Sequence, residues 1–116
     1  MKKSIVFILF MSIFFSCYNN NEEELYGPVS CDLSSVTYSL DVSPIINASC
    51  ATSGCHVAGG TAPGNFANFN EFKAKVDNGT FENRVLIQQN MPPNSQLSDC
   101  EMQTLQAWLD NGALNN

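Results

Sequence analysis

Apolar residues recur at the spacing of an α-helix in the second half of the chain. Phe69, Phe72 and Val76 occupy positions i, i+3 and i+7, which predicts a short helix with one buried face. We expect Asn70 to cap the start of this helix, because its side chain can accept hydrogen bonds from free backbone N–H groups. Asn78-Gly79 is expected to end it, since glycine tolerates the left-handed turn that follows many helices.

Two further helices follow from the same pattern. Thr80 is expected to cap a helix whose apolar residues are Phe81, Val85 and Leu86. The last helix has the clearest signals, because Ser98 and Glu101 form an S-x-x-E capping box and Asn111-Gly112 marks its end. Its apolar stripe consists of Met102, Leu105, Trp108 and Leu109.

The segment before residue 50 is predicted to contain one more helix. Ser43 is expected to cap it and Pro44 to take its first position, where a missing N–H does no harm. The residues expected to face inward are Val42, Ile45 and Ile46. The preceding Val36–Leu40 segment is predicted to be extended, and the helix runs directly into Cys50. The predicted fold class is therefore all-α, with about four helices.

The first 16 residues are predicted to be a secretory signal peptide rather than part of the fold. Lys2 and Lys3 precede an apolar run from Ile5 to Phe15, which is too short to span a bilayer as a mature helix. Ser16-Cys17 follows. A cysteine directly after a small residue resembles the lipobox of bacterial lipoproteins, in which that thiol is lipidated. The alternative is ordinary secretion with Cys17 unmodified.

Composition shifts after the predicted signal. Residues 17–30 are expected to form a flexible acidic tether, because Glu22–Glu24 and their polar neighbours cannot bury a core. Residues 31–116 are then expected to form one domain. Removal of residues 1–16 leaves three cations against eleven acids and changes the formal net charge from −6 to −8. Such a surface does not attract nucleic acid. It suits either solubility or a redox partner with a basic patch.

The stretch from Cys50 to His56 carries the candidate chemistry. Two cysteines followed at once by the chain's one histidine is the order of residues that attaches a c-type haem. Each thiol adds to a vinyl group of the porphyrin, and the imidazole reaches the iron. The usual motif is C-x-x-C-H, whereas four residues separate the cysteines here. Gly54 gives the backbone freedom for a longer arc.

Cys50 and Cys55 have two other interpretations. They are compatible with a small disulfide loop, in which case His56 is an ordinary polar residue. A zinc site is disfavoured, because structural zinc takes four protein ligands and the chain has no second closely spaced Cys or His pair. Cys31 and Cys100 are expected to form a disulfide in an oxidising compartment, whether or not haem is attached.

Two later segments are candidates for completing a haem site. The loop after His56 has no periodicity, and a carbonyl near Pro63 is expected to accept a hydrogen bond from His56 Nδ1. Met91 precedes two prolines that hold its backbone extended, so its thioether is a candidate ligand for the open face of the iron. The alternative is that Met91 fills an apolar gap. Met102 lies on an apolar helix face and is expected to be a core residue.

Together these features resemble the small monohaem class I c-type cytochromes that occur as bacterial lipoproteins. The matching segments lie within about residues 36–114 and are Ser43-Pro44-Ile45-Ile46, Cys50–His56, Met91-Pro92-Pro93 and Leu97–Ala113. The resemblance implies a cytochrome c-like fold around one covalent haem c, with Cys50 and Cys55 as the thioether links. It also implies that His56 is the proximal ligand of the iron and Met91 the distal ligand.

The same resemblance implies one-electron transfer by a haem domain tethered to a bacterial membrane, with respiratory or periplasmic redox proteins as partners. The lipid on Cys17 implies the cell envelope, at the outer membrane, with the domain in the periplasm or at the cell surface. The sequence has no acid–base pair or oriented nucleophile, so we do not expect an enzyme. Two alternatives stay open: a haem-free binding lipoprotein with two disulfides, and a haem-based sensor with an open distal site.

Overall fold

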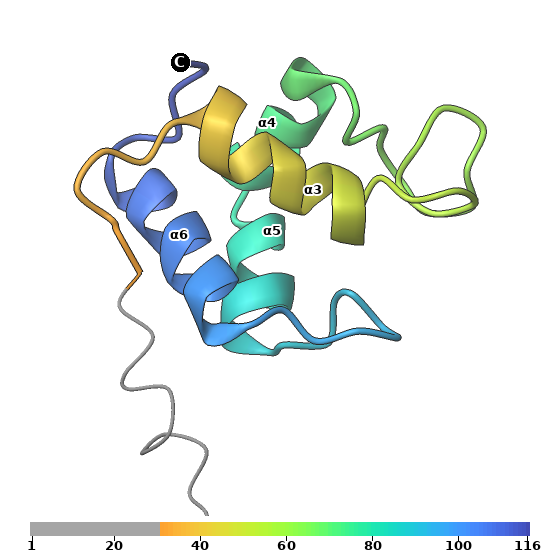
Figure 1. Ribbon diagram of the computed structural model, residues 1–116. Helices are drawn as coiled ribbons and strands as arrows, with labels where there is room; N and C mark the ends of the chain where they lie inside the picture. The colour runs from red at the N-terminus through yellow and green to blue at the C-terminus, as the bar shows by residue number, and fades with distance from the viewer. Residues whose placement is uncertain (1–30) are drawn as a thin grey trace, which may run out of the picture.

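The computed structural model describes residues 31–116, so the predicted signal peptide and tether, including Cys17, lie outside the described residues. Residues 31–116 form four helical segments and no strand (Figure 1). These are the π-helix η2 (Tyr38–Val42) continuing as α3 (Ser43–Ser49), α4 (Phe69–Asp77), α5 (Thr80–Glu82) continuing as the π-helix η3 (Asn83–Ile87), and α6 (Asp99–Asp110). The prediction of an all-α fold with about four helices is confirmed. In this part of the chain no helix has the length and apolar character to cross a bilayer.

The first helix begins earlier than the sequence predicted. The extended conformation expected for Val36–Leu40 is wrong from Tyr38 onward, where η2 begins. Thr37 is the cap, because its Oγ1 accepts from the Leu40 N–H at 3.4 Å while Asp41 Oδ2 accepts from the Thr37 N–H at 2.7 Å. This reciprocal pair satisfies N–H groups that a helix start leaves without partners. Ser43 is therefore an interior residue of the helix and not the predicted cap.

The end of the described chain packs against the same helix start. Asn116 accepts two hydrogen bonds at 2.9 Å, from the Tyr38 N–H through its side-chain Oδ1 and from the Ser39 N–H through its backbone oxygen. The Trp108 indole N–H donates to the Leu114 carbonyl at 2.9 Å, which holds the intervening segment against α6. The segment after α6 is thus hydrogen-bonded both to the start of the first helix and to α6 itself.

Asparagine side chains accept hydrogen bonds at the starts of α4 and α5, upstream of the cap residues that the sequence suggested. Asn68 Oδ1 accepts from the N–H groups of Asn70 at 3.0 Å and Glu71 at 3.3 Å, so Asn68 is the cap of α4 and the predicted cap, Asn70, is wrong. α4 ends at Asp77 and Asn78 is its C-terminal cap, as predicted. Asn78 Oδ1 then accepts from the Thr80 N–H at 3.0 Å. Thr80 is therefore the first residue of α5 and not its cap, because the asparagine oxygen two residues earlier already serves that N–H.

α6 and the disulfide follow the sequence closely. Ser98 Oγ accepts from the Glu101 N–H at 3.3 Å and Glu101 Oε2 accepts from the Ser98 N–H at 2.8 Å, which confirms the capping box. α6 ends at Asp110 and Asn111 is its C-terminal cap, also as predicted. The predicted disulfide joins Cys31 to Cys100 in the first turn of α6. The start of the described chain is thereby fixed covalently to its last helix.

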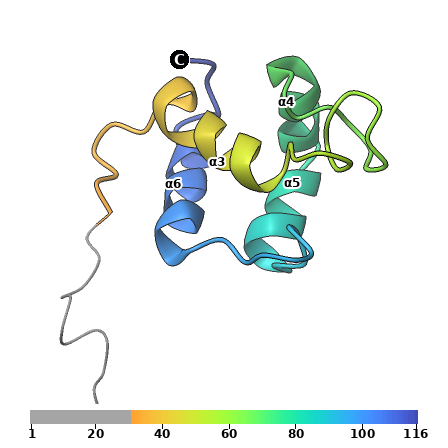
Figure 2. The same ribbon diagram turned by 45° about the vertical axis from the view of Figure 1, so that its right-hand side comes forward.

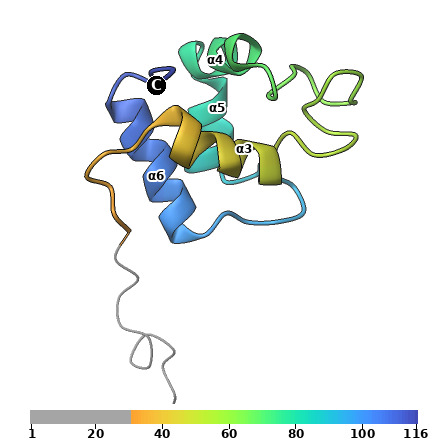
Figure 3. The same cartoon turned by 45° about the horizontal axis from the view of Figure 1, so that its top comes forward.

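The core is a cluster of aromatic and aliphatic side chains drawn from all four helical segments. Phe72 of α4 and Trp108 of α6 stack with ring centroids 5.8 Å apart, and Phe81 of α5 meets Phe72 edge-on at 4.9 Å. Val42 and Ile46 of the first helix are fully buried against them. α3 crosses α6 toward α5 (Figures 2 and 3), and the long loop after it packs against α4, where the Asn65 N–H donates to Glu71 Oε2 at 3.0 Å. This crossing brings Cys50 toward α5.

Candidate functional site

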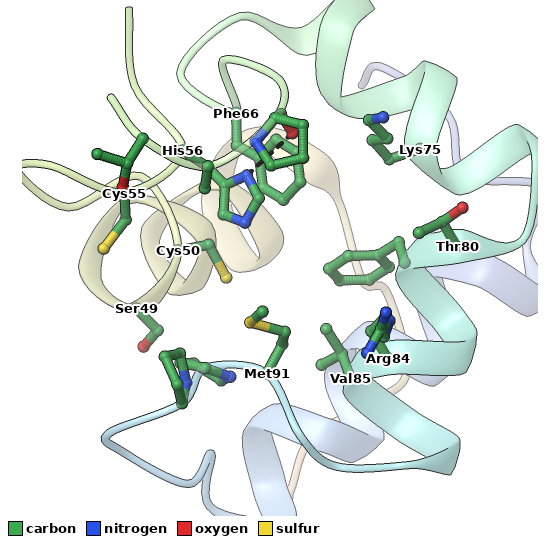
Figure 4. Close-up of a pocket in the computed structure, with 16 residues that line it drawn as sticks. Ser49, Cys50, Cys55, His56, Phe66, Lys75, Thr80, Arg84, Val85 and Met91 are labelled. Carbon is green, nitrogen blue, oxygen red and sulfur yellow. Dashed lines mark hydrogen bonds between the residues drawn. The ribbon is translucent and has the colours of Figure 1, made fainter. Parts of the chain in front are cut away.

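A cavity of about 450 Å³ lies between the end of α3, the loop that follows it, α5–η3 and the Met91–Pro93 segment (Figure 4). The four side chains that the sequence singled out all line it: Cys50, Cys55, His56 and Met91. Its volume falls within the range of about 300–1,000 Å³ that is typical of cofactor and ligand sites. Much of the remaining wall is apolar and consists of Ala62, Pro63, Phe66, Phe81, Val85, Pro92 and Pro93.

Backbone hydrogen bonds fold the segment between the two cysteines into a compact turn. The Cys55 N–H donates to the Thr52 carbonyl at 3.0 Å, and the His56 N–H donates to the Cys50 carbonyl at 3.2 Å. The loop then passes very close to this turn, because a Cβ added at Gly60 would lie 1.9 Å from the Cys55 carbonyl oxygen. Only glycine fits there without a shift of the backbone. The four intervening residues therefore form a closed turn and not an extended arm.

Two neighbours fix the ring of His56. Its Nδ1 lies 3.2 Å from the Pro63 carbonyl oxygen, and because a carbonyl only accepts, Nδ1 carries the hydrogen and donates it. The neutral ring therefore keeps its lone pair on Nε2, and Figure 4 shows the ring turned into the cavity. Phe66 stacks on the ring with centroids 4.0 Å apart and planes 10° apart. The hydrogen bond to Pro63 confirms the prediction, whereas the contact with Phe66 was not foreseen.

Met91 is held at the cavity by the π turn that precedes it. In η3 the Gln88 N–H donates to the Asn83 carbonyl at 2.8 Å and not to the Arg84 carbonyl, its partner in a regular α-helix. The Arg84 carbonyl instead accepts from the N–H groups of Asn90 at 3.1 Å and Met91 at 3.3 Å. The Met91 side chain is 38% exposed, and Figure 4 shows its thioether directed into the cavity.

The two thiols of the motif differ in burial. Cys50 is buried and Cys55 is half-buried, and their sulfurs are not bonded to each other. Burial raises the pKa of the Cys50 thiol to about 11, and repulsion from the Cys55 thiolate adds to this shift. Without a ligand Cys50 is therefore a protonated thiol at neutral pH. Figure 4 shows the Cys50 sulfur turned toward the cavity and Cys55 at its margin.

Two cations at the cavity were missed by the sequence analysis. Lys75 of α4 and Arg84 of η3 both line it. The one sequence feature that could have drawn attention to them is the small number of basic residues, because only three Lys and Arg residues lie outside the first 16 positions. Their positions along the chain have no fixed spacing from the Cys50–His56 motif, so the sequence alone did not connect them with it.

Neither a group of metal-binding side chains within residues 31–116 nor a similarity to a known protein identifies the function of this cavity. Within residues 31–116 no group of three or more His, Cys, Asp and Glu side chains is placed to hold a metal ion, so the zinc interpretation gains no ligand cluster there. Comparisons of the chain with protein-family models, curated proteins and solved structures give no match. The function is therefore argued from the chemistry of the cavity itself.

The residues at the cavity fit a c-type haem. Both thiols line the cavity, and His56 offers Nε2 because its other nitrogen donates its hydrogen to the Pro63 carbonyl. Met91 offers a thioether from a separate segment, and the wall between them is largely apolar. An imidazole, a thioether and an apolar surround are the elements with which proteins bind haem iron and tune its potential.

Proposed function

We propose that this protein is a single-haem c-type cytochrome with a small all-α, cytochrome c-like fold, and that it carries electrons one at a time. When bound, the haem iron supplies a centre that changes its oxidation state by one electron. In this proposal Cys50 and Cys55 would hold the haem through thioether bonds, and His56 and Met91 would bind its iron. The protein's part is to bind, orient and shield the group.

One observation carries the proposal most directly, namely the orientation of His56. Ligation of iron by imidazole needs a nitrogen lone pair that faces the metal, and in metal sites the other ring nitrogen usually donates to a carbonyl or carboxylate. The Pro63 carbonyl accepts that hydrogen at 3.2 Å, which leaves Nε2 as the acceptor atom on the cavity side. Phe66 stacks on the ring and limits its rotation. His56 is thus held as an iron ligand would be.

Met91 supports the same proposal from a different segment. A thioether ligand raises the potential of haem iron relative to a second imidazole, because it stabilises the reduced state. Two main-chain hydrogen bonds to the Arg84 carbonyl anchor the backbone at Asn90 and Met91, so the side chain enters the cavity from a defined position. An iron held by both His56 and Met91 would have no open position for a substrate, which would suit it to electron transfer.

The four-residue gap between the cysteines is compatible with this arrangement. The hydrogen bond from Cys55 to Thr52 closes the extra residues into a turn, so the gap does not lengthen the reach between the cysteines as an extended arm would. The bond from the His56 N–H to the Cys50 carbonyl ties the histidine to the first cysteine. All three motif side chains consequently border one cavity.

The cellular setting of the proposal rests on the sequence. A lipid on Cys17 would anchor the domain to the outer membrane through the acidic tether, either in the periplasm or at the cell surface. The predicted mature chain carries a formal charge of −8. Redox proteins with a basic docking patch are therefore the expected partners, because opposite charges steer such short-lived encounters.

The absorption spectrum of the exported protein tests the proposal. A bacterial host that attaches haem c should yield a coloured protein whose haem stays with the polypeptide in acidified acetone and gives a c-type pyridine haemochrome. Cys50→Ser/Cys55→Ser should release its haem into the solvent. Ser53→Ala, an exposed change in the same turn, should behave like the wild type. A colourless wild-type protein from that host contradicts the proposal.

A second candidate function is a haem-based sensor in which Met91 leaves the iron. The observation that favours it is the 38% exposure of the Met91 side chain, since an exposed ligand is more easily displaced than a buried one. The test is the addition of carbon monoxide to the reduced wild-type protein. A shift of the absorption bands at stoichiometric gas favours the sensor, and an unchanged spectrum favours permanent ligation by Met91.

A further inference from the structure

The cavity has two chemically different ends. Cys50 and Cys55 border one side, and Lys75 and Arg84 border the other, as Figure 4 shows. The two cations come from different elements, Lys75 from α4 and Arg84 from η3. The packing of α4 against α5–η3 therefore brings them to the same side of one cavity.

Neither cation has a carboxylate partner within the described chain. The ion pair found in residues 31–116 joins Lys73 to Asp77, one turn apart on α4. Lys75 and Arg84 have no such pair in this part of the chain, although the protein as a whole carries eleven acidic residues against five basic ones. Few basic residues are present in this chain, yet two of them border one cavity without a carboxylate partner in residues 31–116. This arrangement favours an anionic ligand in the cavity.

Neutral contacts position both side chains. The Asn90 amide is best oriented with its oxygen 3.1 Å from Arg84 Nη1 and its nitrogen 3.2 Å from the Arg84 carbonyl oxygen, which orders the guanidinium without neutralising it. The stem of Lys75 passes the turn at Gly64, where an added Cβ would lie 3.4 Å from Lys75 Cε. Both side chains border the cavity, and no carboxylate within residues 31–116 pairs with either of them.

We propose that Lys75 and Arg84 bind the carboxylate groups of the ligand in this cavity. On the proposed function, on which this inference rests, these groups are the two propionates of the haem. A porphyrin carries its propionates on a different edge from its vinyl groups, which matches a cavity with thiols at one side and cations at the other. Arg84 offers two parallel N–H donors to a carboxylate, and Lys75 acts as a point charge.

A pair of ligands that differ only in charge tests this inference. The full chain with Cys50→Ala/Cys55→Ala, which prevents covalent attachment, is titrated with haemin and with haemin dimethyl ester, whose carboxylates are blocked. The parent should bind haemin more tightly than the ester. Lys75→Gln and Arg84→Gln should each weaken haemin binding about threefold to tenfold, as expected for partly exposed ion pairs, and should leave ester binding unchanged.

Lys73→Gln is the matched control, because Lys73 is a cation of the same helix that pairs with Asp77 away from the cavity. It should change neither affinity, and the helical circular dichroism of all variants should match that of the parent. If the parent binds haemin and the ester equally, or if the Lys75 and Arg84 changes affect both ligands alike, the carboxylate assignment is wrong although the proposed function stands. A parent that binds neither ligand contradicts both.

Discussion

At the scale of single residues, the neighbours of a few side chains determine which atom of each side chain can bind a metal. The Pro63 carbonyl determines which nitrogen of His56 carries the hydrogen, and Phe66 sets the plane of the ring. Met91 is the complementary case, because its backbone is anchored while its side chain stays 38% exposed. These two residues therefore differ in how firmly each would hold a metal.

Removal of the Met91 thioether is the direct test of its role. Met91→Ala should lower the reduction potential of the haem-loaded protein and open a coordination position to carbon monoxide, because the ligand that stabilises reduced iron is gone. Potentiometric titration and the absorption spectrum measure both effects. Met102→Leu is the control, since Met102 borders a separate cavity of about 140 Å³ and not the larger one. An unchanged spectrum and potential in Met91→Ala would refute the ligand assignment.

The buried thiol of Cys50 gives a pH-dependent prediction for the haem-free protein. Its pKa of about 11 exceeds the ordinary value of 9.0, so iodoacetamide should modify it slowly at pH 8 and about tenfold faster per pH unit until about pH 11. The folded state keeps this proton after the unfolded chain has released it. Stability should therefore fall between about pH 9 and pH 11.

Peptide mapping after timed alkylation measures the rate at Cys50, and the urea-unfolded protein is the control in which burial is lost. Equal rates at pH 8 in the folded and unfolded protein would show that Cys50 is not protected by burial.

At the scale of the elements, the caps decide where each helix begins. The reciprocal bonds between Ser98 and Glu101 satisfy backbone groups at the start of α6, next to the disulfide. Ser98→Ala should reduce the free energy of unfolding by about 1 kcal/mol, because one helix N–H loses its acceptor. Urea denaturation measures the loss. Ser95→Ala, an exposed change in the preceding loop, should have little effect, and a loss of equal size there would attribute the effect to the loop.

The same elements show why sequence patterns predict helices better than their boundaries. The apolar spacing of Phe69, Phe72 and Val76 needs only local information, and the helix it predicts is present as α4. The start of η2 depends on a bond between Thr37 and Asp41, a pair with no standard capping spacing. The π turn of η3 rests on the hydrogen bond from the Gln88 N–H to the Asn83 carbonyl, which the spacing of apolar residues does not specify.

The candidate site also contains some residues that the sequence predicts and others that it does not. The Cys50–His56 motif and Met91 could be named from the sequence because their residue types suggest a haem site, and all four named side chains line one cavity. The hydrogen bond from His56 to Pro63 was predictable because a metal-binding histidine usually donates the hydrogen of its other ring nitrogen to a nearby carbonyl or carboxylate. Phe66, Lys75 and Arg84 were not predicted, because only the packing of the loop against α4 and η3 brings them to the cavity.

At the scale of the whole molecule, a small domain encloses a cavity of about 450 Å³ beside its core. Protein interiors are normally close-packed, and in our proposal the haem fills this largely apolar cavity. The Cys31–Cys100 disulfide compensates for the limited core by joining residues 69 positions apart. The chain thus depends on one covalent link that the structure contains and, in our proposal, on two more to the haem.

Loss of the disulfide should destabilise the domain. Cys100→Ser frees a loop of about 70 residues in the unfolded chain, so the free energy of unfolding should fall by up to about 4 kcal/mol. Thermal or urea denaturation measures this change. Wild-type protein treated with dithiothreitol is the matched control and should show the same loss. If reduction leaves stability unchanged, the link does not constrain the unfolded state as we expect.

The mass of the peptide that contains Cys50 and Cys55 tests the central claim most directly. The protein should be exported in a host able to attach haem c, purified and digested, and the peptide analysed by mass spectrometry. We expect one haem added across the two sulfurs. A peptide with both thiols free, or one that has lost two hydrogens to a Cys50–Cys55 disulfide, would contradict the assignment of this cavity to a covalent haem.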